Sequence, residues 1–307
     1  MILGARPPAI FIAGGTGYIG GHLMAALRER GLPVRCLIRT PEKAEVCRGP
    51  MGGAGFETVI GDITDRESLK GALEGAGMVV HLVGIIEEKG PQTFKRVHVE
   101  GTKNLIEEAK QAGVGHFFYQ SALGADTGSW AGYLRTKGEA EELLKASGLP
   151  YTIFRPSLVI GPGDGFTQKI RDFINTLSPV IPVPGKGEAR FQPIYVGDWV
   201  KCLLKIIDNP SSLGRTYELG GPEHLAYNDM VKAVRDAMGS VKPLVHIPVF
   251  LVKAGASLLR VASAEQIKLL EKDNITAPDA VRRDFGFEPL AFREALKLFV
   301  TRYRGGS

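Results

Sequence analysis

The sequence has few cysteines and no long apolar run. Only three of its 307 residues are cysteine, Cys36, Cys47 and Cys202, and no two of them form a C-x-x-C pair. This spacing excludes a disulfide framework and predicts free thiols in a reducing compartment. The longest apolar run near the C-terminus, Ile247–Val252, ends at Lys253 and is far shorter than the ~18 residues that cross a bilayer. We therefore expect a cytoplasmic protein with no transmembrane segment.

The chain also lacks a strong charge of either sign. It carries 38 Lys and Arg against 33 Asp and Glu, a net charge of +5, and its basic residues are scattered without a long run. A nucleic-acid surface is therefore not expected. A modest positive field does suit a small anionic ligand, such as a phosphate-bearing cofactor. The six histidines have no metal-ligand spacing with Cys or Glu, so we predict no metal site.

Glycine, in contrast, is abundant, at 39 of 307 residues, about 13% where ~7% is usual. In the first half of the chain, short apolar runs alternate with segments of helical period. These repeated β-α-β units predict the α/β class, as a Rossmann-type, doubly wound parallel sheet with helices on both faces. The predicted strands are Ala9–Ala13, Val34–Ile38, Glu57–Ile60, Met78–Val83, His116–Gln120 and Tyr151–Arg155. The predicted helices are His22–Arg30, Arg66–Leu73, Val99–Gln111 and Tyr133–Ser147.

The pattern changes after Arg155. Two segments rich in proline and glycine, Gly161–Gly165 and Pro179–Gly187, are typical of long functional loops. A further strand at Gln192–Val196 and a helix at Trp199–Ile207 follow them. We therefore expect a dinucleotide-binding Rossmann domain and a smaller, mostly helical C-terminal lobe for a substrate or partner. The domain is assigned to residues 8–160 plus 191–210, and the lobe to residues 161–190 and 211–303.

The first predicted strand ends in the segment Gly14–Gly20 (GGTGYIG), which contains G-x-G-x-x-G. Glycine permits the tight turn and lets main-chain N–H groups reach a pyrophosphate, while the following helix points its positive end at that anion. The alternative is a plain glycine-rich turn. Because the segment follows an apolar strand and opens a helix, we predict a dinucleotide cofactor here. The residues assigned to it in this turn are Gly14, Thr16, Gly17, Tyr18, Ile19 and Gly20.

Arg39 follows the second predicted strand and stands 19 residues after Gly20. An acidic residue at about this distance accepts from a ribose 2′-hydroxyl, whereas arginine offers a fork of donors to a 2′-phosphate. The sequence therefore favours NADP(H) over NAD(H). The alternative is a solvated loop charge that stacks on adenine.

Further short motifs follow the glycine turn in order along nearly the whole chain. They are Gly61-Asp62, His81–Gly84, Val99–Leu105, Arg155-Pro156 and Gly161–Asp164. Together they resemble the extended and atypical branch of the short-chain dehydrogenase/reductase family. The resemblance implies that Asp62 contacts adenine and that Val83, Gly84 and Pro156 line the cofactor.

Three segments are similar, within that family, to the nucleotide-binding accessory subunit of respiratory complex I and its free-standing bacterial relatives. They are Tyr133–Lys145 (YLRTKGEAEELLK), Gln192–Val196 (QPIYV) and Leu269–Asn274 (LLEKDN). This likeness implies docking on a larger assembly. The apolar stretch from Phe250 to Val261 is either core of the second lobe or a surface that docks on a membrane face or a partner subunit.

Tyr133 and Lys137 form Y-x-x-x-K, so a helix places the phenol and the ammonium on one face. A free tyrosine has a pKa of about 10, and a nearby cation and an oxidised nicotinamide would both favour its phenolate. Tyrosine then becomes a usable acid or base near neutral pH. In the family this pair serves hydride transfer at a carbonyl or alcohol, and the lysine also holds the nicotinamide ribose. The alternative is one surface tyrosine and one solvated lysine.

Two positions bear on turnover. His98 stands where the family has an asparagine of its proton relay, and it either titrates in that place or is a packed helix residue. Ser121 ends the fifth strand, where the family's substrate-orienting serine or threonine lies, but only 11 residues separate it from Tyr133. It either hydrogen-bonds a substrate carbonyl or caps the strand end. The sequence therefore supports nucleotide binding more strongly than turnover.

Three functions remain open. The first is an NADP(H)-dependent oxidoreductase or epimerase-like enzyme, with Tyr133, Lys137 and Ser121 acting on a small organic substrate near Gly163 and Gln192. The second is a structural subunit that keeps NADPH bound and docks on a larger assembly. The third is a sensor of the NADPH/NADP ratio that performs no chemistry. Neither the substrate nor the oligomeric state follows from the sequence.

Overall fold

The chain forms two compact units in the computed structural model, which describes residues 8–44, 56–176, 178–248 and 264–300. The first unit contains Met1–Arg155 and Ile206–Tyr217, and the second contains Pro156–Lys205 and Glu218–Ser307. Two interpretations made from the sequence, the free thiol of Cys47 and the apolar stretch 250–261, concern residues outside the described ones.

A seven-stranded sheet has the strand order β11-β6-β5-β4-β1-β2-β3. Each neighbouring pair from β3 across to β6 is parallel. This order is the 3-2-1-4-5-6 arrangement of doubly wound dinucleotide-binding folds with one strand added at the edge. The predicted α/β class and Rossmann-type sheet are therefore confirmed. The strands are β1 Ala9–Ala13, β2 Val34–Ile38, β3 Phe56–Ile60, β4 Ala76–His81, β5 His116–Gln120, β6 Tyr151–Pro156 and β11 Arg215–Leu219.

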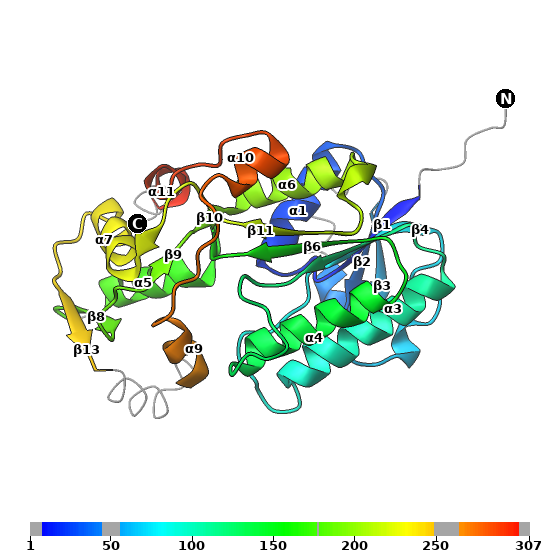
Figure 1. Cartoon of the computed structure of the whole chain (residues 1–307), viewed down its shortest axis with the longest axis horizontal. Coiled ribbons are helices and arrows are strands. Elements are labelled where there is room, and N and C mark those ends of the chain that lie inside the picture. The colour runs from blue at the N-terminus through cyan, green and yellow to red at the C-terminus, as the bar shows by residue number, and fades with distance from the viewer. Residues whose placement is uncertain (1–7, 45–55, 177, 249–263, 301–307) are drawn as a thin grey trace. The chain divides into compact units, whose positions relative to one another are not determined.

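The central strand β1 is buried on both faces because helices cover both sides of the sheet. Phe11 and Ala13 belong to a core cluster that also contains Leu105 of α3 (Gly101–Gln111) and Leu144 of α4 (Gly132–Ala146). Side chains alternate along a strand, so Ile12 points to the opposite face. Figure 1 shows α3 and α4 side by side on one face and α1 (Tyr18–Glu29) on the other. An all-apolar strand is the expected pattern for a sheet that is covered on both faces.

Several predicted boundaries differ from the structure. Helix α1 begins four residues before the predicted His22, because Gly17 is its N-cap. The helix predicted at Arg66–Leu73 is wrong. Only a short 3₁₀ turn, η2 (Glu67–Leu69), forms there, and Gly71 then adopts a left-handed φ of 71° that ends it. The fourth strand ends at His81 rather than Val83.

The helix predicted from Val99 begins inside a π-helical turn, η3 (Lys95–Glu100), which leads directly into α3. The strand predicted at Gln192–Val196 is also wrong as a single element. Two-residue strands form instead, β9 (Arg190–Phe191) just before the predicted range and β10 (Ile194–Tyr195) within it, because Pro193 has no N–H to donate to a ladder.

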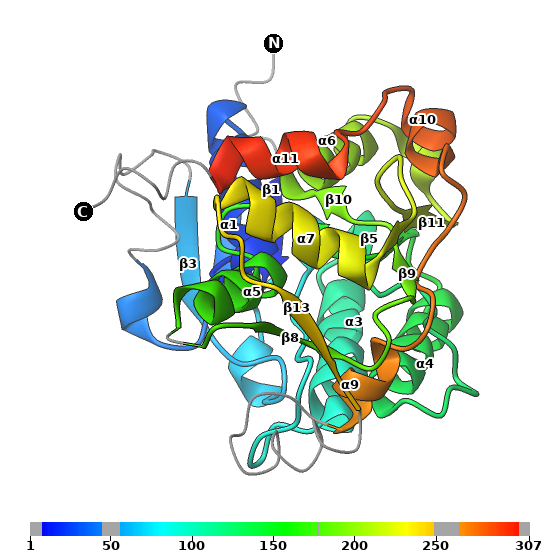
Figure 2. The ribbon, with the colours of Figure 1, turned by 90° about the vertical axis from the view of Figure 1, so that its left-hand side faces the viewer.

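The second unit has its own core. Its cluster includes Ile170, Met230, Val234, Phe292 and Phe299, and α7 lies between α5 and α11 (Figure 2). None of the helices in the described part of the chain is long and apolar enough to cross a membrane. The remaining strands are β7 Val159–Ile160, β8 Ile181–Pro184, β12 Leu225–Ala226 and β13 Leu244–Ile247. The remaining helices are α5 Gly165–Asn175, α6 Val196–Ile207, α7 Tyr227–Ala237, α9 Ala264–Leu269, α10 Ala280–Phe285 and α11 Phe292–Phe299, with 3₁₀ turns at Pro41–Lys43 and Pro210–Ser212.

Candidate functional site

The glycine turn between β1 and α1 depends on two close approaches. Gly14 has a φ of 96°, and a Cβ there would lie 3.0 Å from the carbonyl carbon of Leu82. Gly20 lies in the first turn of α1, where a Cβ would lie 2.2 Å from the carbonyl oxygen of Gly14. The N–H of Gly17 donates to that same oxygen at 3.1 Å. Because no side chain fits at either position, the turn and the helix pack directly on each other.

The start of α1 suits an anion. Gly17 is an extended N-cap, no side chain caps the helix, and no acidic residue lies in its first turn. N–H groups of a first helical turn have no acceptor inside the helix, and they carry the positive end of the helix dipole. A pyrophosphate fits such a terminus. Thr16, Tyr18 and Ile19 lie at this helix start, as their assignment to the cofactor requires.

Arg39 and Asp62 lie at the same edge of the sheet as the glycine turn. Arg39 follows β2 and is exposed, and Asp62 follows β3. Because β1, β2 and β3 are parallel neighbours, their carboxyl ends meet at this edge. Asp62 Oδ1 accepts hydrogen bonds from the N–H and the hydroxyl of Thr64 at 2.8 and 2.9 Å. This turn holds the carboxylate at the edge where open α/β sheets bind their ligands.

Lys137 is buried on α4, one turn after Tyr133. Its Nζ donates to the carbonyl oxygen of Gln120, at the end of β5, at 2.8 Å, and lies 4.9 Å from the centre of the Tyr119 ring. Tyr133 is partly exposed, and its ring meets the ring of His98 edge-on with centroids 5.6 Å apart. The structure therefore excludes the interpretation of Lys137 as a solvated surface lysine.

Burial shifts the pKa of both members of the Tyr-Lys pair. Desolvation lowers the pKa of Lys137 to about 7, and the negative charge of Glu141 opposes this change. Desolvation raises the pKa of Tyr133 to about 12. The expectation that a neighbouring cation favours the phenolate is therefore wrong for the protein's own residues. At neutral pH Tyr133 keeps its proton, and Lys137 is divided between its charged and neutral forms.

His98 is a packed, neutral residue. Its Nε2 accepts the N–H of Ile85 at 3.1 Å, and its Nδ1 is 2.9 Å from the hydroxyl oxygen of Thr136. Desolvation, together with the positive charge of Lys137, lowers the pKa of His98 to about 2. Of the two interpretations of this position, the structure supports packing and contradicts titration near neutral pH.

The hydroxyl of Ser121 is buried and, within the described residues, has no hydrogen-bond partner. The backbone N–H of Ser121 donates to the carbonyl of Phe154 at 2.8 Å. A hydroxyl that caps the end of β5 would form a hydrogen bond with the backbone there, and the hydroxyl of Ser121 forms none within the described residues. A buried polar group without a partner is uncommon in proteins, so the role of this hydroxyl toward a substrate stays a prediction.

The loop after β4 lies against α4. A Cβ on Gly84 would be 3.2 Å from Lys137 Nζ and 3.6 Å from His98 Nε2. Val83 precedes it in the same loop and is partly buried, and Pro156 is the buried last residue of β6. The carboxyl ends of β4, β5 and β6 thus carry the remaining residues that were assigned to the cofactor.

Sequence reasoning missed a buried ion pair beside Lys137. Glu141 lies one turn further along α4 and is fully buried. Nε and Nη2 of Arg155 donate to its two carboxylate oxygens at 2.9 and 2.7 Å, and Lys145 Nζ lies 3.4 Å away. The glutamate four residues after Lys137 and the arginine in an otherwise apolar strand were the available signals.

The segments around Gln192 and Asn274, which carry the likeness to the accessory subunits, are bonded to each other in the second unit. The buried Gln192 accepts the N–H of Thr276 through Oε1 at 2.7 Å. The N–H of Arg190 donates to Asp273 Oδ1 at 2.8 Å, and the N–H of Asn274 donates to the Arg190 carbonyl at 2.8 Å. We call this set of bonds the 192–276 clamp.

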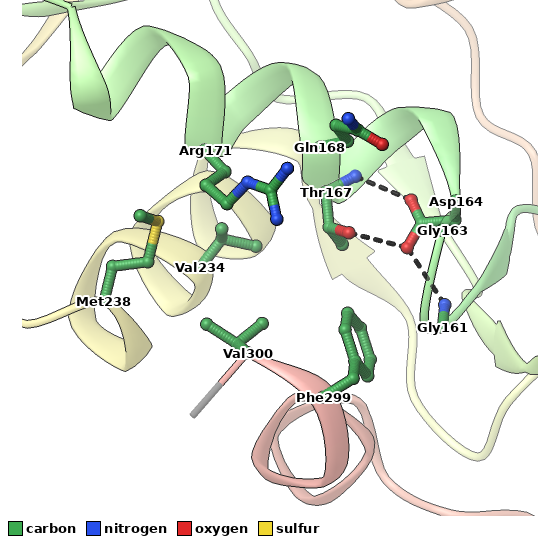
Figure 3. A pocket seen from close by; sticks show the side chains of 10 residues that line it. All are labelled: Gly161, Gly163, Asp164, Thr167, Gln168, Arg171, Val234, Met238, Phe299 and Val300. Carbon is green, nitrogen blue, oxygen red and sulfur yellow. Dashed lines mark hydrogen bonds between the residues drawn. The ribbon is translucent and has the colours of Figure 1, made fainter. Parts of the chain in front are cut away.

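The loop Gly161–Asp164 borders a small pocket of about 20 Å³ in the second unit, between α5, α7 and α11. Figure 3 shows Arg171 extending toward Val234, Phe299 and Val300 across it. The Asp164 carboxylate accepts four hydrogen bonds, from three backbone N–H groups and the Thr167 hydroxyl. Asp164 therefore holds the loop and caps α5 rather than serving as an acid or base.

Comparison with known proteins also indicates a dinucleotide-binding fold. Residues 14–170, just over half of the chain, match the model of a family described as NAD(P)H-binding. The mitochondrial NADH dehydrogenase (ubiquinone) 1 alpha subcomplex subunit 9 of Arabidopsis thaliana is 26% identical over 313 residues, covering 96% of this chain and 78% of that protein. A ceramide reductase of Caulobacter vibrioides is 29% identical over 241 residues, covering 78% of this chain and 73% of that protein.

Among solved structures, a UDP-glucose 4-epimerase of Thermus thermophilus in complex with NAD has a TM-score of 0.75 and 21% identity, covering 97% of this chain and all of that one. At this identity the likeness shows the fold alone. The comparisons confirm the predicted resemblance and the predicted dinucleotide-binding fold, and they do not distinguish NADP from NAD.

Replacing Gly20 with alanine should destabilise the protein, because the new Cβ would overlap the carbonyl oxygen of Gly14. We expect the free energy of unfolding to fall by more than ~2 kcal/mol. Gly21→Ala is the matched control, since a Cβ there meets nothing within 4 Å and alanine should add up to ~1 kcal/mol of helix stability. Denaturant unfolding measures both, and equal stability of the two variants would contradict the close packing of the turn.

The protein should lose stability on acidification, because two buried imidazoles and one partly buried imidazole resist protonation. Desolvation lowers the pKa of His81 to about 3, of His98 to about 2 and of His116 to about 4. Below the unfolded pKa of ~6.5, these imidazoles bind protons in the unfolded chain but not in the folded one. Each therefore lowers the free energy of unfolding by up to ~1.4 kcal/mol per pH unit. The effect is absent above that value and grows as the pH falls toward the folded pKa values.

Urea unfolding at several pH values from ~7.5 to ~4.5 measures this slope. The variant His116→Gln removes one of the three imidazoles, at a position away from the carboxyl edge of the sheet. It should make the dependence of the free energy of unfolding on pH shallower. An unchanged slope in the variant would show that His116 is not held neutral by the fold.

Proposed function

The chain belongs to the NAD(P)H-binding family, and on that premise we propose that it is a short-chain dehydrogenase/reductase-type enzyme that uses NADP(H) rather than NAD(H). It would act as an oxidoreductase or epimerase-like enzyme on a small organic substrate, with Tyr133 and Lys137 as the catalytic pair. The observation that carries this proposal is the buried Lys137 amine, held by the Gln120 carbonyl one turn after Tyr133. Moving an amine out of water costs free energy, and groups with perturbed pKa values gather at functional sites.

The residues at the carboxyl edge of the sheet fit a dinucleotide. The uncapped start of α1 after Gly17 would hold the pyrophosphate. The exposed guanidinium of Arg39 would pair with a 2′-phosphate, and Asp62 would meet the adenine. When bound, the nicotinamide supplies or accepts the hydride. Lys137, beside Gly84, would hold the nicotinamide ribose.

The protonation states support the reductive direction. Tyr133 keeps its proton because burial raises its pKa to about 12, so it is ready to donate to a carbonyl oxygen as the carbonyl carbon gains the hydride. The product is an alcohol, and the partly exposed Tyr133 regains its proton from solvent. The unpartnered hydroxyl of Ser121 would orient the same carbonyl oxygen.

A second candidate function is a nucleotide-binding accessory subunit of a respiratory-type assembly. It is favoured by the Arabidopsis relative, which matches 96% of this chain, and by the neutral, fully bonded His98, which has no lone pair or proton left for a relay. An NADPH sensor would share the same site. Cofactor that survives purification and exchanges only on unfolding would favour the accessory role, whereas steady turnover would favour the enzyme.

Arg39→Ala should weaken NADPH binding by ~1.5–3 kcal/mol, because a hydrogen-bonded charge pair with the 2′-phosphate is lost, and should leave NADH binding unchanged. Arg282→Ala, at a side chain that is 65% exposed in the second unit, is the control and should change neither. Calorimetric titration with both cofactors gives the four constants that are needed. Equal losses for NADPH and NADH in Arg39→Ala would refute the 2′-phosphate assignment.

Tyr133→Phe should lower the rate of NADPH-dependent carbonyl reduction by ~10²–10⁴-fold, because it removes the proton donor, while the Kd of NADPH stays the same. The measurement is cofactor oxidation followed by absorbance across a panel of ketones, aldehydes and quinones, with parent and variant side by side. A variant that turns over at the parent rate would sink the acid–base role. A parent that binds NADPH tightly and reduces nothing in the panel would favour the accessory function.

A further inference from the structure

His98 connects three parts of the first unit that are far apart in the sequence. It lies in the π-helical turn η3, and it accepts the backbone N–H of Ile85 in the loop after β4. Its other ring nitrogen is 2.9 Å from the Thr136 hydroxyl on α4, three residues after Tyr133 and next to Lys137. The imidazole is fully buried and stacks on Phe94 with a centroid distance of 5.5 Å.

The hydrogen bonds of His98 fix a single tautomer. Because a backbone N–H can only donate, Nε2 is the acceptor, so the proton is on Nδ1 and is donated to Thr136. The Thr136 hydroxyl in turn donates to the carbonyl of Gly132 at 2.7 Å. The chain of bonds runs in one direction, from Ile85 to the first turn of α4, and uses both nitrogens.

The π-helical turn sets the position of this ring. The N–H of Gly101 reaches back to the carbonyl of Arg96 rather than to that of Val97, so η3 holds one extra residue per turn. Such insertions place a side chain where a regular helix would not, and they are frequent at functional sites. Here the displaced segment carries His98 toward α4.

The loop that His98 holds has little room to move. A Cβ on Gly84 would lie 3.2 Å from Lys137 Nζ and 3.6 Å from His98 Nε2, so the loop backbone already lies against both groups. Displacement of Ile85 would therefore change the contact between Gly84 and Lys137.

We propose that His98 is a positioning residue whose neutral imidazole ties the loop at Gly84 and Ile85 to the start of α4. It thereby sets the width of the space that receives the nicotinamide half of the cofactor. It does not carry protons, and its loss would act through Gly84, Tyr133 and Lys137. This inference rests on the proposed function, since it presumes that the nicotinamide end lies at Lys137 and the adenosine end at Arg39.

The test separates the two ends of the cofactor with two probes, NADPH and 2′,5′-ADP, the latter having no nicotinamide half. His98→Phe keeps a ring of similar shape and removes both hydrogen bonds. We expect its affinity for NADPH to fall about tenfold, the effect of one unsatisfied buried hydrogen bond, while its affinity for 2′,5′-ADP stays at the parent value. A merely structural role would lower both affinities or neither.

Two further variants complete the experiment. His116→Phe removes a matched imidazole-to-threonine hydrogen bond, Nε2 to Thr152 Oγ1 at 2.9 Å, at the opposite end of β5, and should leave both affinities unchanged. Thr136→Val keeps the shape of the side chain and removes the acceptor of Nδ1–H, together with the hydroxyl's own bond to the Gly132 carbonyl, while it leaves the bond from Ile85 to Nε2 in place. It should shift the NADPH constant in the same direction as His98→Phe by a smaller factor, and it decides the question if His98→Phe does not fold.

The proposal is overturned if the His98 or Thr136 variants lose affinity for both probes equally, or if His116→Phe reproduces the selective loss. A parent protein that binds neither probe overturns the proposed function itself, which is a distinct outcome. Thermal unfolding of each variant without ligand, compared with the parent, shows whether a lost affinity reflects lost folding.

Discussion

The hydrogen bond from Lys137 Nζ to the Gln120 carbonyl places an amine inside the protein, and the groups around it adapt to that constraint. His81 and His98 are neutral in its presence, because burial and the lysine's positive charge both lower their pKa values. Glu141 supplies the compensating negative charge one turn away, and Arg155 holds that carboxylate in place. A solvent-exposed lysine would not affect its neighbours in this way, since water would screen its charge.

The parallel sheet is what brings the chemistry to this amine. Strands β1 to β6 are parallel, so residues that follow β1, β2, β3, β4 and β5 meet at one edge. That edge carries residues that are far apart in the sequence: the glycine turn, Arg39, Asp62, Gly84 and Ser121. Each of these strands is followed by one or two residues of the site, and the packing of the helices determines how deeply those residues are buried.

Much of this arrangement is visible in the sequence because it depends on local patterns. Apolar runs with sharp ends located β1, β2 and β5 at their observed bounds. The glycine turn was recognisable because its glycines are required by backbone geometry alone, which no other residue type satisfies at Gly14. Y-x-x-x-K was recognisable because helical spacing places its members on one face.

The rest depends on contacts that no local pattern encodes. The segment after Asp62 has helical composition, yet left-handed glycines turn the chain before a helix can form. The neutrality of His98 requires Ile85 and Thr136 to be adjacent in space, which follows only from the packing of η3 on α4. The pKa of Tyr133 is raised, opposite to the expectation of a favoured phenolate, because of desolvation, and desolvation also outweighs the charge of Glu141 at Lys137.

The 192–276 clamp has a consequence for how this chain can diverge. It joins two segments 84 residues apart in the sequence through backbone and buried amide hydrogen bonds. This anchorage lets an exposed connection between the two segments change in length at low cost, because doubling the length of a flexible loop costs only about 0.6 kcal/mol of closure entropy.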